Sequence, residues 1–483
     1  MPRPCRTAWI VFALALVARF AFFAAGPSRD PARATAEDST LYVELASRLV
    51  SDHVFAVPAS HQTGMHAFLN SLAVAQPGQS GDQLVAETFR TPGYPAFIAV
   101  ASASLWDIRL VLVAQCLLGA VAAVLVMLTA SGLGLRGVIV TGAGLVWALH
   151  PALILADNSL LSESTFLFCV VSAHFLAVSA RTPSSLLVGA VLLGVATLIR
   201  PPFGLAFVPS IILLSWHRLL PKAGVIAAVC LVAATPPALW AVRNWSIGER
   251  LAVSTVADFA LVFYTAPCAV SESRGEDCDE SYALRREELA QRLRAKASPD
   301  DDMLVLARGF ALQDLRTHAS GALRMYAKSI VKLAISHSAG WWATGLGRTY
   351  RPTSLFSALI QGDRSRVSSM PSLGAVAFPL AWVLFNLLLA ALSVVGLLGL
   401  LIRRDWSRAL ALGLPILALF VAIGAVGQER MRIPIMLSMV LLAGFGCTLG
   451  RAGPAQPGLA RTAGLPRAAV SGNRIERSFE GEE

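Results

Sequence analysis

The chain has 483 residues, of which 55% are hydrophobic and 14% charged, and its mean hydropathy is +0.62. A water-soluble domain of this composition would expose large apolar patches, so we expect a membrane protein with several spans. The formal charge of +10 comes from Lys and Arg in short loops beside apolar runs, with no basic stripe interleaved with aromatic residues, so no nucleic-acid partner is expected.

The N-terminal segment places Arg3 and Arg6 before an apolar run at residues 8–26. Because no convincing cleavage site follows, we predict a retained signal anchor with its N-terminus in the cytoplasm. Arg19 interrupts this run. It can extend to the outer surface, or it can pair with another helix or face a ligand, and the sequence leaves both interpretations open.

A polar segment follows at about residues 27–95. Within it Leu41, Leu45 and Leu49 recur at the spacing of one helical face, which predicts a short amphipathic helix that starts near Asp38 and lies against the membrane surface. An acid in the first turn of such a helix can simply cap it, because its oxygens accept the unpaired N–H groups there.

The remaining apolar stretches alternate with short basic loops, which places both termini in the cytoplasm and predicts about ten spans. Residues 94–106 are too few and residues 326–342 too polar to cross alone, so both should be juxtamembrane or re-entrant. We therefore expect an all-α polytopic bundle in four parts. These are an N-terminal module at 1–242 with its first outer loop at 27–93, an outer region with juxtamembrane helices at 243–372, C-terminal helices at 373–450 and a disordered cytoplasmic tail at 451–483.

Two of the seven cysteines, Cys268 and Cys278, fall in the predicted outer region, where a disulfide can persist. Whether they are bridged stays open at this point. No pair of cysteines in the chain has metal-ligand spacing.

Acids and arginines that are distant along the chain share the outer face in this topology. Each has a simple structural interpretation as loop polarity, helix capping or contact with headgroups. The three charges Glu429, Arg430 and Arg432 lie within four residues beside a span, which is costly near lipid unless they face a polar cavity or headgroups. The full set of charged residues on the predicted outer face is Asp38, Arg90, Asp157, Glu163, Arg200, Arg243, Glu429, Arg430 and Arg432.

Short motifs around these residues resemble the GT-C membrane glycosyltransferases, in particular the bacterial branch of family 39, alongside protein O-mannosyltransferases and the lipid A aminoarabinose transferase. They are Asp38-x-x-x-Tyr42 with Leu45-Ala46, Arg90-x-Pro92-Gly93-Tyr94-Pro95, Glu163 before a Phe/Leu-rich helix, Arg200-Pro201, Arg243-Asn244 and Arg430-x-Arg432-x-Pro434.

This resemblance implies a GT-C-like bundle in which Asp38 is the catalytic carboxylate. Glu37 is the neighbour that can stand in for it, and Glu163 faces the same cavity. The resemblance also places Arg90 near the phosphate of the donor. The other implied substrate-binding residues are Tyr42, Tyr94, Asp157, Arg200, Arg243, Glu429, Arg430 and Arg432.

The implied reaction is inverting transfer of a sugar from a polyprenyl-phosphate donor to an envelope lipid, glycan or protein at the outer side of the cytoplasmic membrane. Such a transfer needs a base, here Asp38, and cations that stabilise the departing phosphate, a task that suits the guanidinium group. No cofactor is required, although Asp38 and Glu163 can also bridge a divalent metal.

Two other classes of protein combine many membrane spans with ionisable residues. A lipid-linked oligosaccharide ligase or polymerase also combines many spans with outer arginines, so it stays an alternative. A transporter or flippase is disfavoured, because its ionisable residues are expected midway through the spans rather than gathered at one face.

Overall fold

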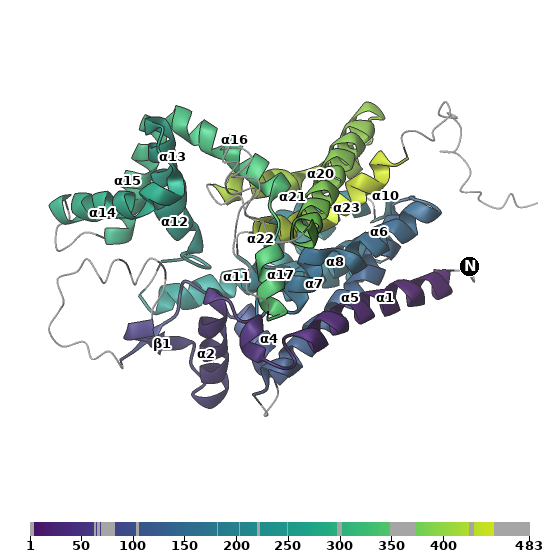
Figure 1. Cartoon of the computed structure of the whole chain (residues 1–483), viewed down its shortest axis with the longest axis horizontal. Helices are drawn as coiled ribbons and strands as arrows, with labels where there is room; N and C mark the ends of the chain where they lie inside the picture. Colours follow the sequence, from purple (N-terminus) through teal and green to yellow (C-terminus); the bar gives the residue numbers. More distant parts are fainter. Residues whose placement is uncertain are drawn as a thin grey trace, which may run out of the picture.

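The computed structural model shows a helical bundle that carries a smaller helical lobe at one end (Figure 1). It describes residues 4–61, 64, 68, 83–102, 106–180, 182–201, 203–219, 223–248, 250–296, 302–347, 373–424 and 429–448. The tail predicted to be disordered at 451–483 lies outside the described residues.

Four described helices are long and apolar enough to cross a membrane: α1 (Pro4–Ala25), α5 (Ile108–Gly132), α11 (Ala223–Ser246) and α20 (Leu373–Ile402). A fifth candidate is bent by 51° between α6 (Val138–Leu149) and α7 (Pro151–Asp157). The bend falls where Pro151 starts α7, and proline cannot donate the backbone hydrogen bond that would continue α6. The chain is therefore an all-α membrane protein.

Shorter apolar helices complete the bundle, and they pack against the long ones. They are α4 (Gly93–Ser102), α8 (Glu163–Ser179), α9 (Pro183–Ile199), α10 (Val208–Leu219) after the 3-10 turn η4 (Gly204–Phe207), α21 (Trp406–Ile423), and α23 (Met436–Gly446) after α22 (Glu429–Arg432) and η6 (Ile433–Ile435). By length and composition the described helices give four spans, or five with the bent pair, so the expected count of about ten remains a prediction.

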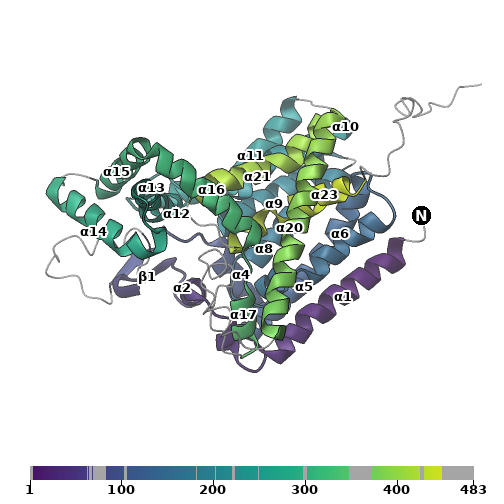
Figure 2. The same cartoon turned by 45° about the horizontal axis from the view of Figure 1, so that its top comes forward.

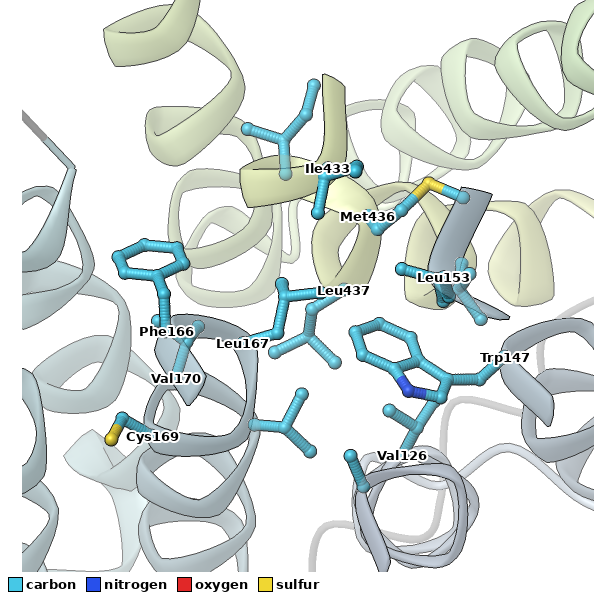
Figure 3. Packing of buried hydrophobic residues seen from close by; sticks show 14 of the residues in the cluster. Val126, Trp147, Leu153, Phe166, Leu167, Cys169, Val170, Ile433, Met436 and Leu437 are labelled. Carbon is cyan, nitrogen blue, oxygen red and sulfur yellow. The ribbon is translucent and has the colours of Figure 1, made fainter. Parts of the chain in front are cut away.

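Helix α8 lies inside the bundle because it is apolar on nearly every face. Phe166 and Leu167 of α8 are buried, as are Trp147 of α6 and Leu437 of α23. Figure 3 shows these side chains converging from helices that are far apart in the sequence. The core thereby fixes the N-terminal end of α8, which begins at Glu163.

The first loop contains η1 (Pro31–Ala34), α2 (Glu37–Ser51), the 3-10 turn η2 (Ala59–His61) and two short antiparallel strands, β1 (Ala56–Pro58) and β2 (Leu84–Ala86). The amphipathic helix is thus found where it was predicted. Its apolar face packs on Phe55, Val57 and Trp240. The strand pair was not predicted, because three-residue strands are too short to show an alternating pattern.

The lobe consists of α12 (Val256–Ala260), the π-helical turn η5 (Leu261–Thr265), α13 (Ala266–Arg274), α14 (Cys278–Lys296) and α15 (Met303–Thr317), with α16 (Ala319–Ile335) and α17 (Ala339–Gly345) leading back to the bundle (Figure 2). It has its own core, which includes Phe263, Leu293 and Phe310. A disulfide joins Cys268 to Cys278, which answers the question that the sequence left open.

Candidate functional site

Asp38 lies between two arginines that come from opposite parts of the chain. Arg90 donates to its Oδ1, and Arg430 lies with Nη1 2.8 Å from its Oδ2. Burial raises the pKa of Asp38, but Arg90 and Arg430 lower it more strongly, so the pKa lies below the ordinary value for Asp. Asp38 is therefore expected to be ionised at neutral pH.

Asp38 is not the cap of its helix. The hydroxyl of Ser39 instead accepts the N–H of Ala36 at 2.8 Å and donates to the carbonyl of Leu160 at 2.9 Å. The carboxylate of Asp38 is thereby left to the arginines, so the capping interpretation does not account for this acid.

Glu163 is the second acid at the site, and its side chain is only 1% exposed. Arg200 lies with Nη1 2.6 Å from its Oε1, and Arg430 donates its Nε to the same oxygen. Arg430 thus bridges Asp38 and Glu163. We call the resulting chain of Arg90, Asp38, Arg430, Glu163 and Arg200 the ionic cluster.

The five residues of the ionic cluster all stand at helix ends or beside them. Asp38 is in the first turn of α2, Glu163 begins α8, Arg200 follows α9, Arg430 lies in α22 and Arg90 precedes α4. Charged side chains at helix ends can meet at one end of the bundle without interrupting the helices themselves. The structure thus brings together five of the residues that the topology places on one face.

Two predicted tyrosines lie next to the ionic cluster. Arg90 donates to the hydroxyl of Tyr42 at 3.4 Å, and its guanidinium lies 5.2 Å from the centre of that ring. Tyr94 meets Tyr42 edge to face at 4.9 Å but donates its hydroxyl to Gln115 at 2.7 Å. Tyr42 therefore contacts the arginine directly, while Tyr94 supports it from behind.

Asp157 is directed away from the ionic cluster, into a buried pair with Arg19. Its Oδ2 lies 2.6 Å from Nε of Arg19, and its Oδ1 accepts from Ser164 at 2.5 Å. The remaining donors of Arg19 include Nη1, which reaches the carbonyls of Ala15 and Ala148. Of the two interpretations of Arg19, the pairing between helices is the one found, and the carboxylate of Asp157 contacts Arg19 and Ser164 rather than the ionic cluster.

Two further predicted residues, Arg243 and Arg432, make structural contacts. Arg243 donates to the carbonyls of Glu87 and Phe55, both at 3.0 Å, and so ties α11 to the strand pair. Arg432 pairs with Glu429 at 2.6 Å and donates to the carbonyl of Leu333 at the end of α16. Glu37 begins α2, but its side chain lies outside the described residues.

Glu429 is half of a pair that is enclosed by α16, α17 and α20. It accepts the N–H of Ser338 at 2.6 Å as well as the contact from Arg432. Burial raises the pKa of Glu429 above its ordinary value, although Arg432 opposes this. Neither residue of this pair has a described contact with the ionic cluster, so we assign both to the junction of the lobe with the bundle.

Gln115 is a residue that sequence reasoning missed. It lies inside α5 and is fully buried, and its Nε2 donates to the carbonyl of Ser159 at 2.8 Å. Together with the contact from Tyr94, this amide fixes the loop that leads into Glu163. The available signal was a single amide in an otherwise apolar run, which in a membrane helix marks a position of special use.

The charge balance of the ionic cluster favours an anion. Three guanidinium groups face two carboxylates within the cluster, and beside it the buried Glu87 interacts with both Arg90 and Arg243, so four arginines and three acids leave one net positive charge. The Nε atoms of Arg90 and Arg200 are buried donors without a hydrogen-bond partner. A phosphate group matches such donors in charge and geometry.

A divalent metal bridging Asp38 and Glu163 does not fit this arrangement. Both oxygens of Asp38 contact arginine, and Arg430 stands between the two acids. Only Oε2 of Glu163 lacks a partner, and one oxygen amid three guanidinium groups is a poor cation site. The site therefore offers its chemistry through arginine and carboxylate.

Comparison with known proteins adds no family to this picture. No family model, curated protein or solved structure that we compared with the chain matches it. The resemblance to GT-C enzymes accordingly rests on the short motifs alone, and it enters below as part of a proposal.

Proposed function

We propose that this protein is an inverting glycosyltransferase of GT-C architecture with about ten spans. It would move a sugar from a polyprenyl-phosphate donor to an envelope lipid, glycan or protein at the outer face of the cytoplasmic membrane. The observation that carries the proposal is the position of Asp38, an ionised carboxylate held between Arg90 and Arg430 in a cluster with net positive charge.

In this reaction the acceptor oxygen attacks the anomeric carbon of the sugar on the face opposite the phosphate. The bond between that carbon and the phosphate oxygen breaks as the new glycosidic bond forms, so the anomeric configuration inverts. Asp38 takes the proton of the acceptor, and the polyprenyl phosphate leaves with the electron pair. Arg90, Arg430 and Arg200 are the cations available to stabilise its charge.

Under this proposal, binding of the donor would prepare Asp38 to act as the base. In the structure both oxygens of Asp38 are held by arginines, so the carboxylate has little capacity to accept a proton. A phosphate that contacts Arg90 or Arg430 competes with Asp38 for the same donors. Its binding would free one carboxylate oxygen beside the sugar and raise the pKa of Asp38 toward the value that burial favours.

The alternative of a lipid-linked oligosaccharide ligase or polymerase draws on the same arginines. Such an enzyme takes a diphosphate-linked oligosaccharide, and three arginines can serve one or two phosphates. The two activities differ in the product, which is a single added sugar for the glycosyltransferase and a transferred or extended oligosaccharide for the ligase or polymerase.

The deciding experiment is a mass analysis of envelope glycans and lipids from cells that lack the protein. The cells are complemented with the wild type, with Asp38→Asn or with Glu44→Gln. Glu44 is a matched control, because it lies on the same helix but pairs with Arg48 and His61.

We expect one sugar to be missing without the protein and restored by the wild type and by Glu44→Gln. Asp38→Asn should restore less than about one hundredth of it, because a general base contributes at least this factor. Full rescue by Asp38→Asn would remove the base from the mechanism. Loss of a whole oligosaccharide from the product would favour the ligase or polymerase.

A further inference from the structure

Helix α16 has one face packed into the protein and one that is largely exposed in the part of the chain that the structure describes. The packed face carries Gly321, Met325, Ser329 and Leu333, which are four residues apart and buried. The opposite face carries apolar side chains at helical spacing, and Leu323 and Val331 are 73% and 55% exposed. We call this face the α16 stripe; it consists of the exposed residues Leu323, Ala327, Ile330 and Val331, of which Ile330 also borders Phe420 of α21.

The α16 stripe lies beside the part of the bundle that faces lipid. Helix α16 packs against α20 and α21, as Figure 2 shows. The hydroxyl of Tyr326 donates to the carbonyl of Val421 near the end of α21, and the side chain of Val421 is 70% exposed. Exposed leucines continue this apolar surface along α20, a candidate span. The stripe thus lies beside exposed apolar side chains of a candidate membrane span.

One flank of the stripe is cationic. Arg324, Lys328 and Lys332 follow each other at four-residue spacing, between the exposed stripe and the packed face. Lys328 pairs with Glu272 at 2.7 Å while 61% of its side chain remains exposed. An apolar stripe with cations along its edge is the pattern of a helix that lies in the membrane interface, where cations meet lipid phosphates.

The far end of α16 is bonded to the segment that carries Arg430. Arg432 donates to the carbonyls of Leu333, Ala334 and Ser336, and Glu429 accepts the N–H of Ser338. The position of α16 therefore also determines where α22 lies.

We propose that α16 is an interfacial helix whose stripe is immersed in the outer-leaflet boundary of an anionic lipid bilayer. Through Arg432 and Glu429 it would hold α22, and with it Arg430, at a fixed height relative to the lipid headgroups. The contact with lipid does not depend on the glycosyltransferase proposal, so either can fail without the other.

The test uses the full chain with a nitroxide label, reconstituted in vesicles of phosphatidylethanolamine and phosphatidylglycerol. Single cysteines are placed by Leu323→Cys and Val331→Cys after the exposed free cysteines Cys230 and Cys447, and also Cys5, are replaced by Ser; Cys116 and Cys169 are buried. Leu284→Cys is the matched control, an exposed leucine on α14 of the lobe. The measurement compares collision of each label with oxygen, which concentrates in lipid, and with a water-soluble nickel chelate.

We expect the labels at residues 323 and 331 to collide with oxygen at least about five times more often, relative to nickel, than the label at 284. Ratios equal to that of residue 284 would place the stripe in water and overturn the proposal. Low collision with both reagents, with spin–spin broadening, would show that a second copy of the chain covers the stripe, which also overturns it. Because all three positions are exposed, the labels should not disturb folding, and a single monodisperse peak in size-exclusion chromatography checks this.

Discussion

Arg430 bridges Asp38 and Glu163, with Nη1 2.8 Å from Asp38 and Nε donating to Glu163. The three residues come from the first loop, the start of α8 and the short helix α22. One guanidinium group therefore holds together segments from the beginning, the middle and the end of the chain. Several expectations depend on this bridge.

Replacing the bridge should damage activity more than it damages folding. We expect Arg430→Gln to lower kcat/KM by about 100- to 1000-fold, the usual cost of one donor that stabilises developing charge. Arg430→Lys should recover little, because an ammonium is a point charge that cannot contact two separate acids in the same way. The assay is transfer of a sugar from a polyprenyl-phosphate donor by the purified protein.

The control for this series is Arg403→Gln, an exposed arginine just after α20. It should retain the activity of the wild type. Equal losses in Arg403→Gln and Arg430→Gln would mean that the assay reports general stability rather than the bridge.

The pH dependence of kcat/KM should report Asp38. Because Arg90 and Arg430 hold the pKa of Asp38 below its ordinary value, Asp38 stays ionised in the free enzyme at pH values where an ordinary aspartate begins to take up a proton, and activity should fall only at lower pH. The same ion pairs stabilise the fold above the ordinary pKa, and this stability is lost as the pH falls through the lower pKa of the folded state.

Burial raises the pKa of Asp38 and Arg90 lowers it. Arg90→Gln removes part of the lowering, so the pKa of Asp38 should rise and the acid limb of the pH profile should shift to higher pH. The control is Arg48→Gln. Arg48 lies on the same helix as Asp38 but pairs with Glu44 and Asp52. An acid limb at the same pH in Arg90→Gln and the wild type would show that Asp38 is not the group that titrates.

The buried pair of Arg19 and Asp157 should matter for stability. We expect Arg19→Met to destabilise the protein by about 3–5 kcal/mol, because it leaves a buried carboxylate without its partner. The double variant Arg19→Met with Asp157→Leu should recover most of this loss, since no buried charge remains. Thermal unfolding in detergent micelles measures both.

An exposed pair serves as the reference. Asp107 and Arg109 lie 3.8 Å apart and are both more than 40% exposed, so Arg109→Met should cost less than about 1 kcal/mol. If Arg19→Met were no more harmful than Arg109→Met, the pair of Arg19 and Asp157 would contribute little to the stability of the bundle.

The disulfide between Cys268 and Cys278 should stabilise the lobe. It closes a loop of ten residues, for which the entropy of the unfolded chain predicts about 2–3 kcal/mol. The double variant Cys268→Ser with Cys278→Ser should therefore exchange amide hydrogens faster in α13 and α14 than the wild type. Cys230→Ser, which removes an exposed free cysteine, should leave this exchange unchanged.

The sequence by itself determined the membrane class and the position of the amphipathic helix α2 in the first loop. Leu41, Leu45 and Leu49 share one face of α2 because the helical period is a local property of the backbone. The same holds for the candidate spans, whose apolar length can be counted along the chain. The predicted topology also placed Asp38, Arg90, Glu163, Arg200 and Arg430 on one face. Each of these residues lies at or near a helix end, and the topology predicts which side of the membrane that end is on.

Only the tertiary structure decided how these charges are paired. Nothing local separates Arg430, which bridges two acids, from Arg432, which donates to the end of α16, although they are two residues apart. Asp157 and Glu163 occupy similar positions in the sequence, yet one faces Arg19 and the other Arg200. A side chain's partner depends on helix rotation and on close packing between distant segments, and the pattern of one sequence does not contain that information.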